Sequence, residues 1–254
     1  MLRRLLVIAS NDFRELLRSP LGWCTLALYQ LMLGSVFLLM VWQYMRTQPM
    51  LVSAELSSGI TALVVARMCK PAFLLMLLMT PVLSMGSFAG ERRQGSFSLL
   101  MSSPLSMTTL VLGKYLGLLG FLLVLVCLTS LMLVSLRLGG HLDLHLLMAC
   151  ILALCLVAAS FAAIGIYISS LCRSPASAAL GCLAALVVLW NLDAGLASSD
   201  TAMAGALGHL SLSRHSYALT RGVFSTADLA YFALLVVTFL ALALRRLDAQ
   251  RTVD

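Results

Sequence analysis

Long apolar segments without charge recur along the chain, and they restrict its fold more than any other feature. The first, from Leu21 to Trp42, contains no charged residue in 22 positions. As an α-helix it would be about 33 Å long, which is enough to cross the hydrocarbon core of a bilayer. Trp23 and Trp42 stand at its two ends, where interfacial aromatic residues are expected. The segment predicts a membrane-spanning helix.

The composition extends this prediction to the whole chain. Of the 254 residues, 61% are hydrophobic and 11% are charged, whereas a soluble domain has about half apolar and a quarter charged residues. A soluble core could not bury so many apolar side chains, so we expect a multi-pass membrane protein. The net charge of +7 then indicates cytoplasmic loops, and no nucleic-acid partner is expected.

We expect one all-α integral membrane domain over residues 1–254, with six transmembrane helices. The predicted spans are apolar runs that cover residues 21–42, 71–89, 111–136, 144–171, 178–197 and 229–244. Residues 43–70 are predicted to form a polar-to-mixed loop in which Ser57 to Cys69 is an interfacial or half-inserted segment, and residues 198–228 are predicted to form a long outer loop. Pro81 is expected to kink the second span, and Ser106 to cap the helix of the third.

Residues 2–18 have the pattern of an amphipathic helix. At about 100° per residue, most of the apolar side chains fall on one arc about 120° wide. Phe13 lies on this arc, and Arg3, Arg4, Arg14 and Arg18 lie on the opposite side. The pattern predicts a helix in the membrane interface with its arginines towards lipid phosphates. A helix packed on a soluble domain is the alternative.

The distribution of Lys and Arg predicts the orientation in the membrane. With the N-terminus inside, eleven of these residues fall on the inner side and six on the outer side. Positively charged loops are retained in the cytoplasm, so both termini and residues 90–110 are predicted to be cytoplasmic.

No motif for covalent or hydrolytic chemistry is present. Gly113-Lys114 lacks the earlier glycine of a phosphate-binding loop, and zinc-protease and nucleophile-elbow patterns are missing. The seven cysteines lie mostly in apolar runs without zinc-site spacing, which favours packing over a metal or disulfide role. We therefore expect no enzymatic activity, metal or cofactor in this chain. The predicted spans hold few ionisable groups, so any transport should draw its energy from a partner.

A charged, glycine- and serine-containing stretch, residues 90–110, separates the second and third predicted spans, and we name it the elbow. Glu91, Arg92 and Arg93 would each cost about 2.5–3.5 kcal/mol at mid-bilayer, so they fix the depth of the preceding helix end. Gly95 permits a sharp change of direction. A short apolar turn closed by Pro104 follows, with the side chains of Phe97, Leu99, Leu100 and Met101. By composition, the elbow is either a docking site for a partner protein or an ordinary hairpin resting on the interface.

The elbow and its flanks resemble the permease subunits of type-2 ABC exporters, the ABC-2 superfamily, and in particular its GldF-like gliding-motility branch. The similarity rests on Pro81, Met85, Glu91-Arg92-Arg93, Gly95-Ser96, Leu99-Leu100, Pro104 and Gly113-Lys114. The N-terminal RELLRSP and the segment containing Arg221-Gly222-Val223 and Asp228 are similar to the entry helix and last outer loop of the family. Ser96 replaces a common Thr, and Ser98 stands where Glu is usual, which would alter docking to an ATPase.

The resemblance implies two permeases of six spans each, seated on two copies of an ABC ATPase subunit that bind ATP and Mg²⁺. The second permease would be another copy or a paralogue, in the bacterial cytoplasmic (inner) membrane. The elbow would be the coupling helix in the ATPase groove, with the N-terminal helix as a second contact. The residues expected to couple to the ATPase are Glu91, Arg92, Arg93, Gly95, Ser96, Phe97, Leu99, Leu100 and Pro104. The implied function is ATP-driven export. The alternative is a subunit that passes ATPase motion to a periplasmic partner without moving a solute.

Overall fold

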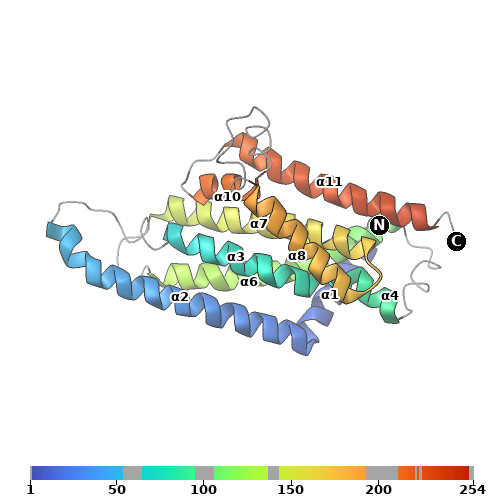
Figure 1. The fold of residues 1–254 in the computed structure, drawn as a ribbon, viewed down its shortest axis with the longest axis horizontal. Coiled ribbons are helices and arrows are strands. Elements are labelled where there is room, and N and C mark those ends of the chain that lie inside the picture. The colour runs from blue at the N-terminus through green and yellow to red at the C-terminus, as the bar shows by residue number, and fades with distance from the viewer. Residues whose placement is uncertain are drawn as a thin grey trace.

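The computed structural model describes residues 2–53, 65–94, 106–136, 143–192, 211–220, 222 and 225–251. These residues are almost entirely helical and include no β-strand (Figure 1). In chain order the helices are α1 (Leu2–Arg18), α2 (Pro20–Ser53), α3 (Ala66–Ser84), the π-helical segment η2 (Gly86–Gly90), α4 (Glu91–Gln94), α6 (Met107–Ser135), α7 (Leu144–Leu171), α8 (Pro175–Asn191), α10 (Leu212–Thr220) and α11 (Thr226–Arg251).

Within the described ranges, five helical stretches are long and apolar enough to cross a membrane: Pro20–Arg46, Arg67–Arg93, Met107–Ser135, Leu144–Leu171 and Thr226–Gln250. The all-helical, multi-pass membrane architecture is therefore confirmed. The predicted fifth span, residues 178–197, corresponds to α8, an apolar helix of 17 residues. Residues 193–197 of that prediction lie outside the described part of the chain.

The predicted loop over residues 43–70 is wrong at both ends. The helix α2 continues to Ser53, and α3 begins at Ala66, so Arg67 and Lys70 belong to a helix. Helical hydrogen bonds close within the backbone, so a helix can continue through polar residues beyond the apolar layer, and α2 does so even though the extension contains Pro49. The intervening residues 57–64 of the predicted interfacial segment lie outside the described residues.

Polar residues at the helix starts explain where several helices begin. The Ser106 hydroxyl accepts from the backbone N–H of Thr109, as predicted, and Asp143 and Ser174 cap α7 and α8 in the same way. Such caps satisfy backbone donors that a first helical turn leaves without partners. Beyond Pro81 the α-helical geometry stops at Ser84, and η2 and α4 complete the second span.

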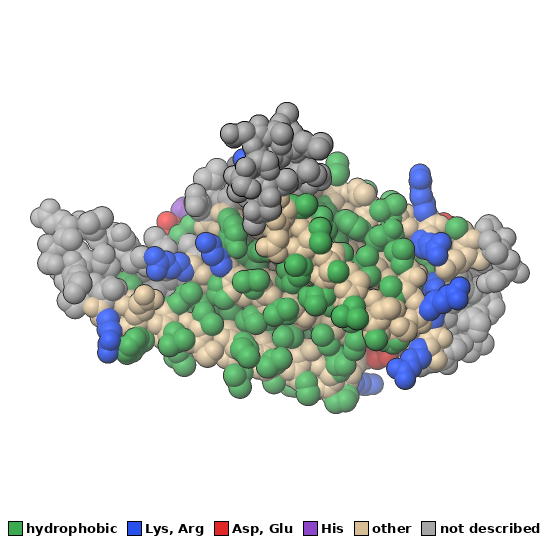
Figure 2. Space-filling model, in the orientation of Figure 1, with side chains coloured by type: hydrophobic (Ala, Val, Ile, Leu, Met, Phe, Trp, Pro, Cys, Tyr) green, Lys and Arg blue, Asp and Glu red, His purple; other side chains and the backbone are tan. Residues whose placement is uncertain are grey.

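Helix α7 lies at the centre of the bundle and packs against α3, α6, α8, α10 and α11. Gly165 allows α3 to approach closely, since a Cβ added there would lie 2.8 Å from Ser84 Cβ. The flanking spans, α2 and α11, are the least buried of the five. Figure 2 shows hydrophobic side chains across the middle of one face, with Lys and Arg gathered towards its two ends. This is the surface expected of a helical bundle with a lipid-facing belt.

The bundle has two chemically different ends. The start of α1, the short helix α4 and the end of α11 lie at one end, which we call the α4 end (Figure 1). At the opposite end, the α10 end, the ring of Tyr217 from α10 packs on Trp190 of α8 and Phe73 of α3, with ring centroids 5.9 and 6.3 Å away. Helix α10 falls within the predicted outer loop of residues 198–228.

Candidate functional site

Three glycines on α6 form a groove that holds α1. A Cβ added at Gly113 would lie 2.6 Å from Ile8 Cγ2, and one added at Gly117 would lie 2.8 Å from Asp12 Cβ. At Gly120 the nearest atom would be a ring carbon of Phe13, at 3.2 Å. Positions 113, 117 and 120 share one helix face, and small residues at this spacing let two helices approach closely. The two helices therefore pack along this groove.

This packing corrects the prediction for the apolar face of α1. The helix has the predicted bounds, but Phe13, Leu16 and Leu17 pack against the protein core instead of facing lipid tails alone. Leu6 and Val7 remain exposed. The four predicted arginines, Arg3, Arg4, Arg14 and Arg18, are exposed on the other side. Their contact with lipid phosphates remains a prediction.

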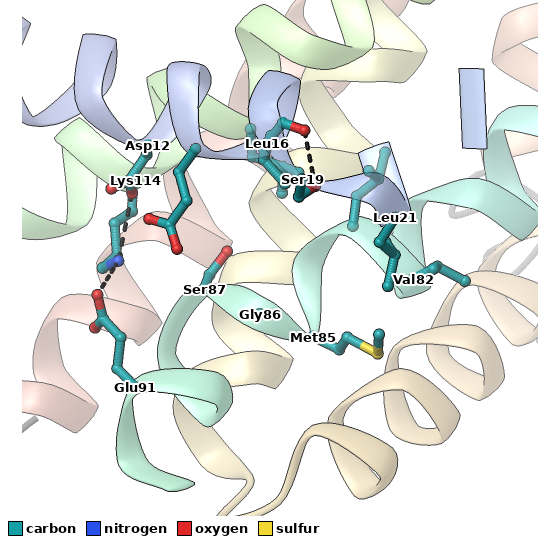
Figure 3. A pocket seen from close by; sticks show the side chains of 13 residues that line it. Asp12, Leu16, Ser19, Leu21, Val82, Met85, Gly86, Ser87, Glu91 and Lys114 are labelled. Atoms are coloured by element: carbon teal, nitrogen blue, oxygen red, sulfur yellow. Dashed lines mark hydrogen bonds and ion pairs between the residues drawn. The ribbon is translucent and has the colours of Figure 1, made fainter. Parts of the chain in front are cut away.

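Lys114, next to the first glycine of the groove, joins three helical elements through its ammonium group. Only 4% of its side chain is exposed, and its Nζ lies 2.7 Å from Glu91 Oε1 and 3.3 Å from Asp12 Oδ2 (Figure 3). The ring of Phe88 lies on another side, with its centroid 5.4 Å from Nζ. Asp12 belongs to α1, Glu91 to α4 and Lys114 to α6. We call Asp12, Lys114 and Glu91 the clasp.

The clasp offsets the cost of burying a charge. An ammonium removed from water loses several kcal/mol of hydration, and the two carboxylates at 2.7 and 3.3 Å provide an opposing attraction. Removing one partner of such a buried pair costs about 3–5 kcal/mol, because the remaining charge stays buried. The two carboxylates come from elements that are far apart in sequence, so the clasp also fixes how α1 and α4 lie relative to each other.

A second set of polar contacts fixes the end of the second span to α7 and α11. Nη2 of Arg92 donates to the Ser170 carbonyl at 3.1 Å and to Gln250 Oε1 at 2.6 Å. The backbone N–H groups of Phe88 and Ala89 point to the Ser169 hydroxyl, at 3.1 and 3.3 Å. These two backbone N–H groups of the π-helical segment η2 thereby find a hydrogen-bond acceptor in a side chain of α7.

A cavity of about 200 Å³ opens beside the clasp, between α1 and η2. One wall comes from α1 and the start of α2, and the opposite wall from α3, η2 and α4 (Figure 3). Its polar lining groups are Asp12, Glu15, Ser19, Ser87, Glu91 and Lys114, and its apolar ones include Leu16, Leu21, Val82, Leu83, Met85 and Leu118. Helix α1 and η2 are thus separated by a hollow that the ammonium of Lys114 bridges.

The residues predicted to couple to an ATPase are placed as follows. Glu91 and Arg92 make the internal contacts described above, and Arg93 is exposed at the α4 end. The other predicted coupling residues, Gly95, Ser96, Phe97, Leu99, Leu100 and Pro104, lie outside the described residues. The structure thus assigns an internal role to two members of the charged trio, and the docking role remains a prediction.

Sequence reasoning missed Asp12, Gly117 and Gly120. The glycines carried a readable signal, because three residues spaced by four and three positions on an apolar helix indicate a close helix contact. Asp12 carried no such signal, since an acidic residue on the polar side of an amphipathic helix is usually solvated. The described residues contain no group of three His, Cys, Asp or Glu side chains able to hold a metal ion.

An apolar helical bundle, an amphipathic entry helix and a charged end of the second span define a multi-pass membrane subunit. Residues 6–250 match the family model described as ABC-2 family transporter protein. The chain therefore belongs to the ABC-2 transporter family and is a membrane component of an ABC transporter, a family whose permeases work with a separate ABC ATPase. No curated protein matches it significantly. The resemblance to the gliding-motility branch remains a prediction.

Proposed function

We propose that this chain is the permease subunit of an ATP-driven exporter. In this proposal two permeases, either two copies or this chain and a paralogue, form the pathway in a bacterial cytoplasmic membrane. Two ATPase subunits bind at the α4 end, which faces the cytoplasm together with both termini. ATP and Mg²⁺ are bound by those subunits, and their closure displaces the elbow and the spans attached to it.

The observation that most supports this function is the grouping at the α4 end. A chain of this family needs a cytoplasmic surface on which an ATPase can act, and here α1 and the start of the elbow are held together at one end. The exposed Arg93, with the exposed Arg3 and Arg4 at the start of α1, gives that end a basic surface. An acidic groove rim on an ATPase would be attracted to it.

Co-expression with a candidate ABC ATPase tests the proposal. The permease is purified through its own tag, and the bound ATPase and the ATP turnover are measured. Two variants, Arg93→Glu and Leu99→Pro, should lower bound ATPase about tenfold, the effect of losing about 1.4 kcal/mol of binding. The matched control is Arg46→Glu, an exposed arginine towards the α10 end of α2, which should bind as the parent does.

The results separate three outcomes. Stimulation of ATP turnover by a candidate solute, with loss of binding in both elbow variants, supports an export permease. Turnover that responds only to an added periplasmic protein indicates the mechanotransmitting alternative. If the parent chain binds no ATPase, or if both elbow variants bind as tightly as Arg46→Glu, the proposed function is refuted.

A further inference from the structure

We propose that Lys114 is a positioning residue that makes α1 and the elbow move as one body during the transport cycle. The inference rests on the proposed function and extends it, because it states how the two cytoplasmic contacts with an ATPase stay in register. It also gives a physical role to the Gly113-Lys114 pair, which is one of the features that this chain shares with the ABC-2 permeases it resembles.

The first step in the argument is that α1 and α4 are joined mainly through Lys114. Helix α1 packs on α6 and α2, and the described residues show no comparable packing of α1 against η2 or α4. Between them lies the cavity of about 200 Å³. The Lys114 ammonium crosses one side of this hollow, with Asp12 of α1 and Glu91 of α4 both in contact. Without the ion pairs of Lys114 across this cavity, α1 and α4 could shift independently of each other.

The second step is that the glycine groove and the clasp act on the same helix. Gly113 and Gly117 let α1 lie against α6, and this close approach brings Asp12 within 3.3 Å of Lys114 Nζ. On its other side Lys114 reaches Glu91, the first residue after η2. A displacement of the elbow is therefore transmitted to α1 and α6 through two short ion pairs and one rigid groove.

The third step concerns the choice of lysine. The sequence contains 15 arginines and two lysines, Lys70 and Lys114, so lysine is rare where a positive charge alone would serve. An ammonium is a compact charge with three donors on one nitrogen, whereas a guanidinium is a larger planar group whose donors are fixed in a rigid fork. A buried site between two carboxylates of different helices fits the ammonium. Lys114→Arg should therefore not preserve the linkage.

The test uses the full-length permease in lipid nanodiscs, with spin labels on keto amino acids at Asn11 of α1 and Arg93 of α4, both exposed. Labelling a keto group avoids the seven native cysteines. The distance between the labels is measured by pulsed electron spin resonance in the parent, in Lys114→Met, and in Asp12→Asn and Glu91→Gln, which each remove one half of the clasp. The matched controls are Lys70→Met, at the other end of α3, and Glu15→Gln, a carboxylate lining the same cavity.

The parent and both controls should give one narrow distance peak. Lys114→Met, Asp12→Asn and Glu91→Gln should each raise the fraction outside that peak at least about fivefold, the lower range of coupling between linked sites. If Lys114→Met does not fold, the two carboxylate variants decide. The same narrow peak in the clasp variants and in the controls would overturn the proposal.

A second readout distinguishes positioning from a merely structural role. In the complex with an ATPase, Lys114→Met and Asp12→Asn should keep ATPase binding and ATP turnover while transport per ATP falls at least about fivefold. Unchanged transport per ATP in Asp12→Asn would refute the proposal. The spin-label distances are measured without an ATPase, so the two proposals can fail separately. A failure of ATPase binding would refute the proposed function, whereas the distances alone decide whether Lys114 links α1 to α4.

Discussion

The close contact between α1 and α6 makes Gly117→Ala the most informative single substitution. The new Cβ would lie 2.8 Å from Asp12 Cβ and 3.2 Å from the Ala9 carbonyl oxygen, both short of an ordinary van der Waals contact, which begins at 3.4 Å. Both atoms are close to the α1 backbone, so they cannot swing away as the end of a long side chain could. The helix α1 must move out by about 0.6 Å to relieve the contact with Asp12.

The energetic consequence can be worked from these distances. Overpacking of a close-packed contact costs about 1–3 kcal/mol. The same shift would lengthen the 3.3 Å Lys114–Asp12 contact by at most about 0.6 Å, which weakens an ion pair already at the long end of hydrogen-bonding distance. Replacing glycine by alanine within a helix returns about 1 kcal/mol of helix propensity. Gly86→Ala is the matched control, because a Cβ there meets nothing within 4 Å.

The assay is equilibrium unfolding in mixed micelles by titration with sodium dodecyl sulfate, followed by circular dichroism. We expect Gly117→Ala to have a free energy of unfolding about 1–3 kcal/mol lower than Gly86→Ala. In the spin-label measurement it should also broaden the α1–α4 distance. If the two variants differ by less than about 0.5 kcal/mol, the usual scatter for a neutral substitution, then α1 is not seated in the groove as described.

Three further experiments test other contacts. Gly165→Ala should lower stability by about 1–3 kcal/mol in the same titration, and adding Ser84→Gly should recover most of the loss, because Ser84 Cβ is the atom in the way. Failure of the second change to recover stability would contradict the assigned contact. Trp190→Ala should lower the free energy of unfolding by about 3–5 kcal/mol and speed amide hydrogen exchange in α10 but not in α1. If α10 is as well protected in this variant as in the parent, the ring cluster does not hold α10 in place. Arg92→Gln should speed amide hydrogen exchange in the last turn of α11, because it removes the hydrogen bond to Gln250. The control Arg93→Gln, at an exposed position, should not change this exchange. Identical exchange in both variants would argue against the contact between α4 and α11.

Features that depend on neighbouring residues in the chain could be predicted from the sequence. The bounds of α1 and α7 agree with the predictions for residues 2–18 and 144–171, and Ser106 caps α6 as expected. Hydrophobic periodicity, the length of an uncharged segment and capping residues depend on residues within a few helical turns of one another, so they can be recognised in the sequence alone. The extent of α2 beyond the apolar layer was not predicted, because Pro49, a residue type that usually ends a helix, lies within α2 four residues before Ser53.

The sequence by itself therefore determined that this chain is a bundle of apolar helices with an amphipathic entry helix and charged residues at the end of the second span. Only the tertiary structure decided what those charges do. Lys114 is 102 residues from Asp12 and 23 from Glu91, and it meets both because α1 lies in the glycine groove of α6. Helical periodicity tells which residues share a face, but the partner of that face depends on how the helices pack. Lys114 is consequently a buried bridge between three elements.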